Sequence, residues 1–147
     1  MRIRKAVALM LLLTLAACKD TQLRDLVNAS DKVADTTLII QKAAVDAENA
    51  GTLTRNQTRF IMETSIRVLT ANDKANNIAR DLSKLDAPSR AQLLSVLTPI
   101  IAEVNKAIVD PNITGIQNAN VRNSITASFQ AVQASLNSIN LILATAK

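Results

Sequence analysis

The stretch VRNSITASFQAVQASLNSINLIL, from Val121 to Leu143, decides the expected fold. Its large apolar residues recur at spacings of three and four, which places them along one side of an α-helix. They are Val121, Ile125, Phe129, Val132, Leu136, Ile139 and Leu143. A helix with a continuous apolar stripe must bury it against other elements. The stretch therefore predicts one helix of a packed helical body.

The polar side of this region is almost free of charge. Between Pro111 and Lys147 there is no acidic residue, and the bases are Arg122 and Lys147. Because uncharged polar groups cost less to desolvate than charges, this side is a candidate contact surface. It is equally what a chain rich in Asn and Gln would give without any selected role.

Two earlier segments carry similar stripes, and both predict amphipathic helices. In residues 21–49 the stripe includes two hydroxyls: Leu23, Leu26, Ser30, Val33, Thr37, Ile40, Ala44 and Ala47. In residues 88–109 it is Leu93, Leu97, Ile100, Val104 and Ala107 or Ile108, widened by Leu94, Val96 and Ile101. Pro99 lies inside the second segment, where we expect a kink.

The segment between these two helices is less regular. Its apolar positions are Met62, Ile66, Leu69, Ala71, Ala75, Ile78, Leu82 and Leu85. Their register shifts around residues 72–74, which predicts a helix that bends or rotates its buried face there. Thr54 and Gln57 fit a capping box at its start. The sequence Asp86-Ala87-Pro88 predicts its end, because proline disfavours helical geometry in the preceding residue.

The remaining helix ends complete an all-α fold. Asp20 is a candidate N-cap for the first helix, and Gly51 a candidate stop. Ser89 and Gln92 resemble a capping box for the third helix, which Asp110-Pro111-Asn112 should end. With the last helix expected over residues 116–144, the short connections favour an antiparallel, up-down-up-down four-helix bundle.

A shift of 64 residues aligns the first two helices with the last two. Residues 42–46, KAAVD, then match residues 106–110, KAIVD, and Gly51 falls on Gly115. Alanine-rich helices match easily by chance, so the alignment leaves open whether the bundle consists of two duplicated helical hairpins.

The composition excludes most catalytic sites. The chain has no histidine and one cysteine, so zinc sites, Ser-His or Cys-His nucleophiles and di-iron motifs each lack a member. The glutamates Glu48, Glu63 and Glu103 share no local motif. We expect no enzymatic activity and no cofactor. The absence of Trp and Tyr also argues against stacking on nucleic-acid bases.

The first eighteen residues have the layout of a secretory signal. A basic start precedes an uncharged run over residues 6–17, which is too short for a bilayer span of about 20 residues. The run closes with Leu15-Ala16-Ala17-Cys18, which resembles the lipobox of bacterial lipoproteins. The resemblance covers these residues alone, and we recognise no family in the remainder of the chain.

The resemblance implies a processed and acylated protein. In lipoproteins the signal is cut just before the cysteine, here between Ala17 and Cys18. The cysteine receives fatty-acyl chains such as palmitate. Lys19, rather than aspartate, follows the cysteine, which implies the periplasmic face of the outer membrane. We therefore expect a signal peptide over residues 1–17, a lipidated start with a short linker over 18–20, and the bundle over 21–147.

Antiparallel order places residues 86–88 and 141–143 near the lipid anchor, and the two glycine loops at the opposite end, which we call the tip. Each tip loop has oxygen-bearing side chains before its glycine: Asp46, Glu48 and Gly51, then Asp110, Asn112 and Gly115. The pattern is part of a calcium loop, but it lacks the acid at the twelfth position, so no metal is expected. These residues are candidate partner contacts.

The sequence thus predicts a lipid-anchored envelope protein that acts as a structural or adaptor module and binds another envelope protein or itself. Two alternatives remain: a carrier that holds an apolar ligand between its helices, and an elongated coiled-coil oligomer. The processed chain has fourteen basic and twelve acidic side chains, a balance that does not indicate nucleic-acid binding.

Overall fold

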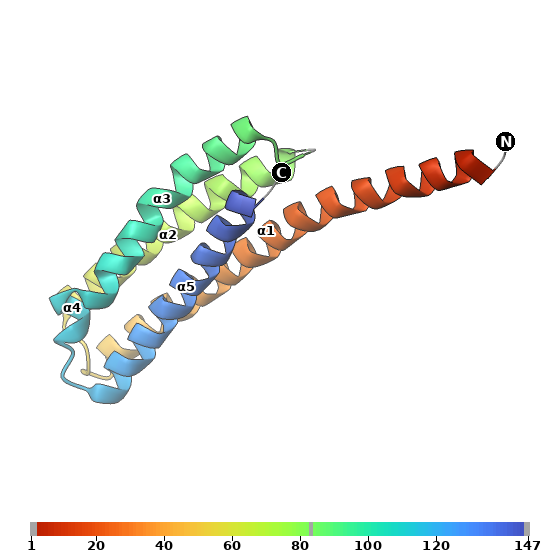
Figure 1. The fold of residues 1–147 in the computed structure, drawn as a ribbon. Helices are drawn as coiled ribbons and strands as arrows, with labels where there is room; N and C mark the ends of the chain where they lie inside the picture. The colour runs from red at the N-terminus through yellow and green to blue at the C-terminus, as the bar shows by residue number, and fades with distance from the viewer. Residues whose placement is uncertain (1–2, 83, 146–147) are drawn as a thin grey trace.

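The computed structural model describes the backbone of residues 3–82 and 84–145, and the side chains of these from Thr21 onward. The described residues form helices and their connections (Figure 1). The helices are α1 (Ile3–Asn49), α2 (Arg55–Asp81), α3 (Ala87–Val109), α4 (Pro111–Thr114) and α5 (Ala119–Thr145).

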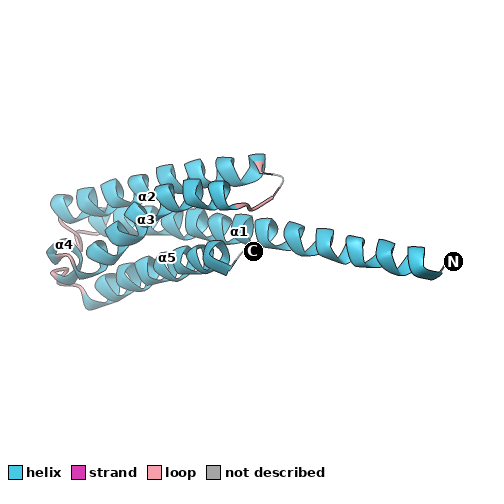
Figure 2. Cartoon of the chain, turned by 45° about the horizontal axis from the view of Figure 1, so that its top comes forward, coloured by secondary structure: helices cyan, strands magenta, loops and turns pink. Residues whose placement is uncertain are grey.

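The four long helices form an antiparallel bundle, as predicted. α1 packs against α2 and α5, and α3 packs against the same two helices, so the four close a ring (Figures 1 and 2). The start of the bundle at Thr21, the α2–α3 connection and the end of α5 lie together at one end. We call this the Thr21 end; the tip, with α4 and the α1–α2 loop, is opposite.

Each long helix buries a stripe of residues at spacings of three and four, the pattern of left-handed bundle packing. The stripe of α1 is Leu26, Ser30, Val33, Thr37, Ile40, Ala44 and Ala47. Those of α3 and α5 are Leu93, Leu97, Ile100, Val104 and Ala107, then Ile125, Phe129, Val132, Leu136, Ile139 and Leu143. The three predicted stripes are confirmed, with Leu23 and Val121 half-buried at their ends.

The predicted stripe of α2 is wrong in its first half. Ile66 is 53% exposed, while Met62 and Leu69 are half-buried. The buried stripe instead keeps one register throughout: Thr58, Ile61, Ser65, Val68, Asn72, Ala75 and Ala79. The predicted shift at residues 72–74 does not occur, because Asn72 itself points into the core and finds a hydrogen-bond partner there.

That partner is Ser30 on α1. The Ser30 hydroxyl donates to Asn72 Oδ1 at 3.0 Å, and Asn72 Nδ2 donates to the Ser30 carbonyl at 3.0 Å. Both bonds are buried, so they fix how α1 and α2 align along their length. The sequence did not predict that α2 buries polar residues such as Asn72, because sequence alone does not show which polar side chains will find a hydrogen-bond partner in the core.

The bundle is asymmetric in side-chain size. The stripes of α1 and α2 are rich in alanine, serine and threonine, whereas those of α3 and α5 contain leucine, isoleucine and phenylalanine. Small side chains let helix backbones approach closely. The packing of α1 against α2 and α5 is more extensive than that of α3 against the same two helices.

Several helix ends differ from the predictions. Thr54 caps α2 with the predicted box to Gln57, but α2 ends at Asp81 rather than near residue 85. Asp86 does not end α2; it is the N-cap of α3 and accepts from the Ser89 amide, so the predicted Ser89 cap is wrong. α1 continues N-terminally to Ile3, so no N-cap lies at residue 20.

The two tip loops differ in conformation. Gly51 has a positive φ of 70°, and the amides of residues 51–53 donate to the last carbonyls of α1. Gly115 instead ends α4, the single-turn helix that the sequence did not predict. With the 64-residue shift, the buried stripe of α2 from Ile61 to Ala79 falls on the buried stripe of α5. The two loops differ in conformation, however, so duplication stays a prediction.

Within the described residues, the stretch 87–114 is the one helical region that is long and apolar enough to cross a membrane. In this structure its stripe from Leu93 to Ala107 packs into the bundle core. It is therefore a helix of the bundle here.

Candidate functional site

The predicted cleavage and lipidation residues, Ala17 and Cys18, lie outside the residues whose side chains the structure describes. Both assignments stay predictions. What the structure does describe is the Thr21 end, which begins three residues after Cys18. Any group attached at Cys18 therefore lies next to this end of the bundle.

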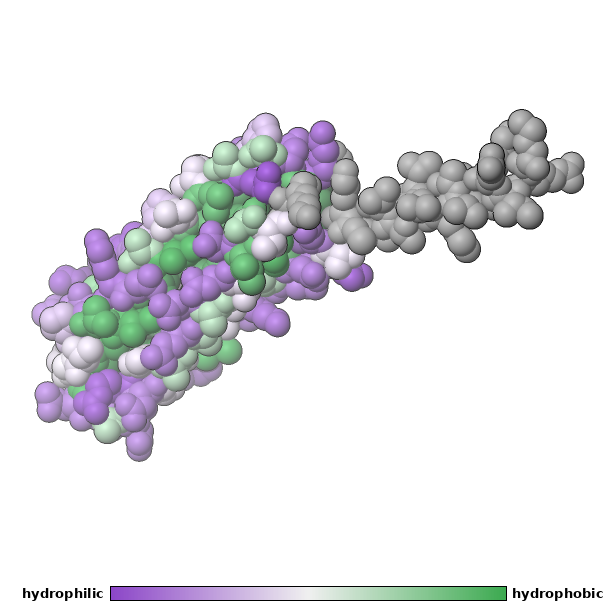
Figure 3. Space-filling model, viewed as in Figure 1, coloured by the Kyte–Doolittle hydropathy of each residue, from purple (hydrophilic) through white to green (hydrophobic). Residues whose placement is uncertain are grey.

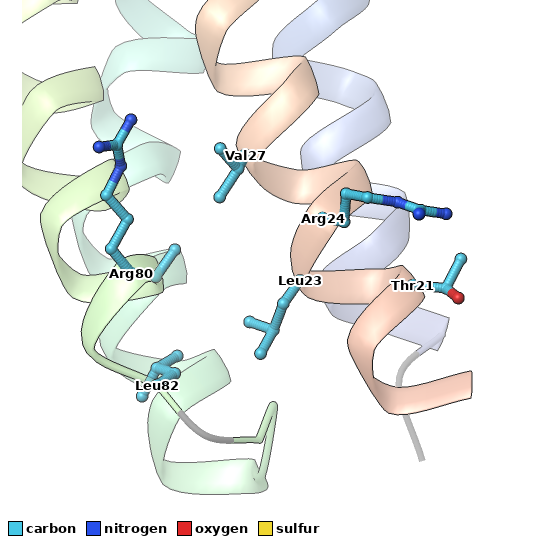
Figure 4. A pocket seen from close by; sticks show the side chains of 7 residues that line it. Thr21, Leu23, Arg24, Val27, Arg80 and Leu82 are labelled. Atoms are coloured by element: carbon cyan, nitrogen blue, oxygen red, sulfur yellow. The ribbon is translucent and has the colours of Figure 1, made fainter. Parts of the chain in front are cut away.

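A cavity between described residues opens at the Thr21 end, between α1 and α2. It has a volume of about 670 Å³ and is lined by Thr21, Leu23, Arg24, Val27, Ala79, Arg80 and Leu82. Figure 4 shows Leu23 and Val27 pointing from α1 into the gap, with Arg80 along its other side. The Arg24 side chain extends across α1 instead.

The six predicted contact residues do lie at the tip, but most have a local structural task. Asp46 pairs with Lys42 at 2.6 Å, and Glu48 lies 3.9 Å from the guanidinium of Arg55. The side chains of Lys42, Asp46 and Arg55 are largely exposed, so these ion pairs add little to the stability of the fold.

Asp110 and Asn112 organise the start of α4. Asp110 Oδ1 accepts from the Asn112 amide at 2.8 Å and from Asn112 Nδ2 at 2.9 Å. A Cβ at Gly115 would lie 2.6 Å from the Pro111 carbonyl oxygen, which explains the glycine. No group of three or more acidic side chains gathers among the residues that the structure describes, so the tip offers no ready metal site there.

An apolar patch lies on the outside of the bundle along the α1–α2 seam, and its α2 members were predicted to be buried. Val27 and Arg80 both line the cavity between α1 and α2, so they mark the sides of these helices that meet at the surface. On α1, Leu38 lies three whole helical turns after Val27, and Val45 lies five turns after it. On α2, Leu69 lies three turns before Arg80, and Met62 lies five turns before it. All four therefore face the same seam.

Ile66 lies beside Met62 and Leu69 on α2, and the Ser30–Asn72 bonds bring it level with Leu38. Leu38 and Ile66 are each 53% exposed, and Val45 is 43% exposed. We call Leu38, Val45, Met62, Ile66 and Leu69 the α1–α2 patch. A cluster of apolar side chains at the surface, of which Leu38, Val45 and Ile66 are exposed, marks a candidate interaction surface.

The outer side of α5 is nearly uncharged, as the sequence indicated, whereas α3 carries Arg90, Glu103 and Lys106. Figure 3 shows hydrophobic groups between hydrophilic ones on the side of the molecule where α3 and α5 lie. Gln133 of α5 donates to Asn105 of α3 at 2.6 Å. The α1 and α2 exteriors carry most of the ion pairs, including the one that joins Arg67 of α2 to Glu103 of α3.

Comparison of the chain with protein families, with curated proteins and with solved structures finds no match.

Proposed function

We propose that this chain is a bacterial lipoprotein whose helical bundle, held at the membrane through Cys18, acts as a structural or adaptor module in the cell envelope. The observation that carries the proposal is the signal-like stretch closing with Leu15-Ala16-Ala17-Cys18. Directly behind it stands a bundle whose buried hydrophobic side chains, among those that the structure describes, run from Leu26 to Leu143.

Acylation at Cys18 would orient the bundle. Two or more acyl chains hold a protein firmly, whereas one chain binds only marginally. Because Thr21 starts one helical turn later, the Thr21 end would face the lipid and the tip would face away. We assign the protein to the periplasmic face of the outer membrane, on the strength of Lys19.

The adaptor role is supported by the α1–α2 patch. It lies along the side of the bundle, so it stays accessible when the Thr21 end rests on a membrane. Its central side chains, Leu38 and Ile66, are exposed although both helices have complete buried stripes. The carrier alternative needs space for an apolar ligand between all four helices, whereas the described buried side chains of these helices form one core cluster.

Photo-crosslinking in intact cells tests the adaptor role. A crosslinking residue at position 66 should join one defined envelope protein, and the same residue at exposed Asn137 on α5 should give far less product. Crosslinks between copies of the chain would support an oligomer instead. Equal, diffuse products from positions 66 and 137 would contradict a specific docking surface.

A further inference from the structure

The cavity at the Thr21 end combines an apolar floor with basic side chains. Leu23 and Val27 of α1 and Leu82 after α2 provide the apolar surface, Arg80 lies along one side, and Arg24 is a lining residue whose side chain extends away from the gap in Figure 4. Its volume of about 670 Å³ falls within the range of small-molecule sites. A ligand that fits this chemistry has an anionic part joined to a hydrocarbon part.

Both arginines are available for an external anion. Arg24 forms no ion pair with another described residue, and Arg80 makes one long hydrogen bond, 3.4 Å to Asn76. By contrast, Arg55 and Arg67 each pair with a glutamate elsewhere on the bundle. Guanidinium groups are well suited to phosphate because their planar donors match two oxygens at once.

Among the residues whose side chains the structure describes, the acids next to these two arginines in sequence do not line this cavity. Asp25 lines a different surface cavity, between α1 and α5, and Asp81 is not among the residues around the cavity at the Thr21 end. In Figure 4 the Arg24 side chain extends away from the gap, so its guanidinium must rotate to join that of Arg80. Arg24 is exposed, and such rotamer changes are fast for exposed side chains.

We infer that this cavity binds the phosphate headgroup of an anionic phospholipid, so that the Thr21 end docks on the membrane surface rather than hanging from it. The inference rests on the proposed function, which places lipidated Cys18 about 4.5 Å along the helix axis from Thr21. At that separation the cavity mouth reaches the headgroup layer. Leu23, the apolar lining residue of α1 nearest to Cys18, then meets the outer part of the acyl chains.

Hydrogen exchange of the lipidated protein in vesicles tests this docking. One sample contains phosphatidylcholine alone, and the other an equal mixture with phosphatidylglycerol. Exchange in residues 21–27 and 79–82 should slow several-fold in the mixed vesicles, because each arginine near an anionic surface contributes roughly a fivefold preference. The double variant Arg24→Gln/Arg80→Gln should lose this slowing.

The matched control is Arg55→Gln/Arg59→Gln, which removes two charges at the tip and should keep the slowing. Equal exchange in both kinds of vesicle, or slowing that survives Arg24→Gln/Arg80→Gln, overturns the inference. A chain that takes up no fatty acid at Cys18 would instead remove the lipoprotein proposal itself, so the two failures can be told apart.

Discussion

At the scale of single residues, the buried pair of Ser30 and Asn72 has the clearest structural role. Its two hydrogen bonds satisfy both side chains inside a core where an unpaired polar group is costly. On the same stripe of α2, the Ser65 hydroxyl is fully buried and has no hydrogen-bond partner among the described residues. The two positions therefore predict opposite responses to removal of the polar group.

Asn72→Ala should lower the free energy of unfolding by about 1 to 3 kcal/mol, because it leaves the Ser30 hydroxyl without its acceptor. Ser65→Ala should be neutral or slightly stabilising, since it removes a buried hydroxyl that makes no bond. Urea unfolding of both variants and the parent protein measures the difference. The assignment fails if Ser65→Ala costs as much as Asn72→Ala.

At the scale of helices, the start of α3 depends on one ionised cap. Asp86 accepts from the hydroxyl of Ser89 at 2.6 Å and from its amide at 3.1 Å. These bonds, with a smaller contribution from the Lys84 ammonium, hold the pKa of the Asp86 carboxyl below its ordinary value of 3.8. A carboxylate near a helix N-terminus also interacts favourably with the helix dipole.

Because the folded-state pKa of Asp86 is lowered, its contribution to stability is present above the ordinary aspartate pKa and is lost as the pH falls through the folded-state value. Asp86→Asn keeps a capping oxygen but cannot titrate. Its stability deficit relative to the parent should therefore shrink as the pH is lowered from neutral to below 3.8. A deficit that stays constant across that range, measured by urea unfolding, would contradict the ionised cap.

Helix existence and the stripes of α1, α3 and α5 could be predicted from sequence, because their apolar residues repeat at helical spacing. The α2 stripe could not, since apolar residues on its outer side, such as Ile66, outweighed the polar residues that it buries, such as Asn72. The α2 members of the α1–α2 patch were predicted to be buried, and Leu38 and Val45 were not assigned a role from the sequence. α4 was missed because its single turn depends on a local cap at Asp110.

At the scale of the whole molecule, the arrangement of the ends was predictable and the surface was not. Four antiparallel helices place the tip loops together, so Asp46 and Asp110 could be assigned to one end from topology alone. Their side-chain partners, and the cavity that Val27 and Arg80 share, depend on the rotation of each helix about its axis. Those rotations follow from packing of the stripes, which connection lengths do not specify.

The central claim is that the Thr21 end of the bundle is a membrane end because Cys18 carries lipid. The direct measurement is mass spectrometry of the N-terminal fragment of the protein purified from a bacterial envelope, beside the Cys18→Ser variant labelled with fatty acid. We predict a parent chain that begins at Cys18 with diacylglyceryl and acyl groups, and a variant that remains uncut and unlabelled. A parent chain with an unmodified Cys18, or a variant that is still cut and labelled, would contradict the account.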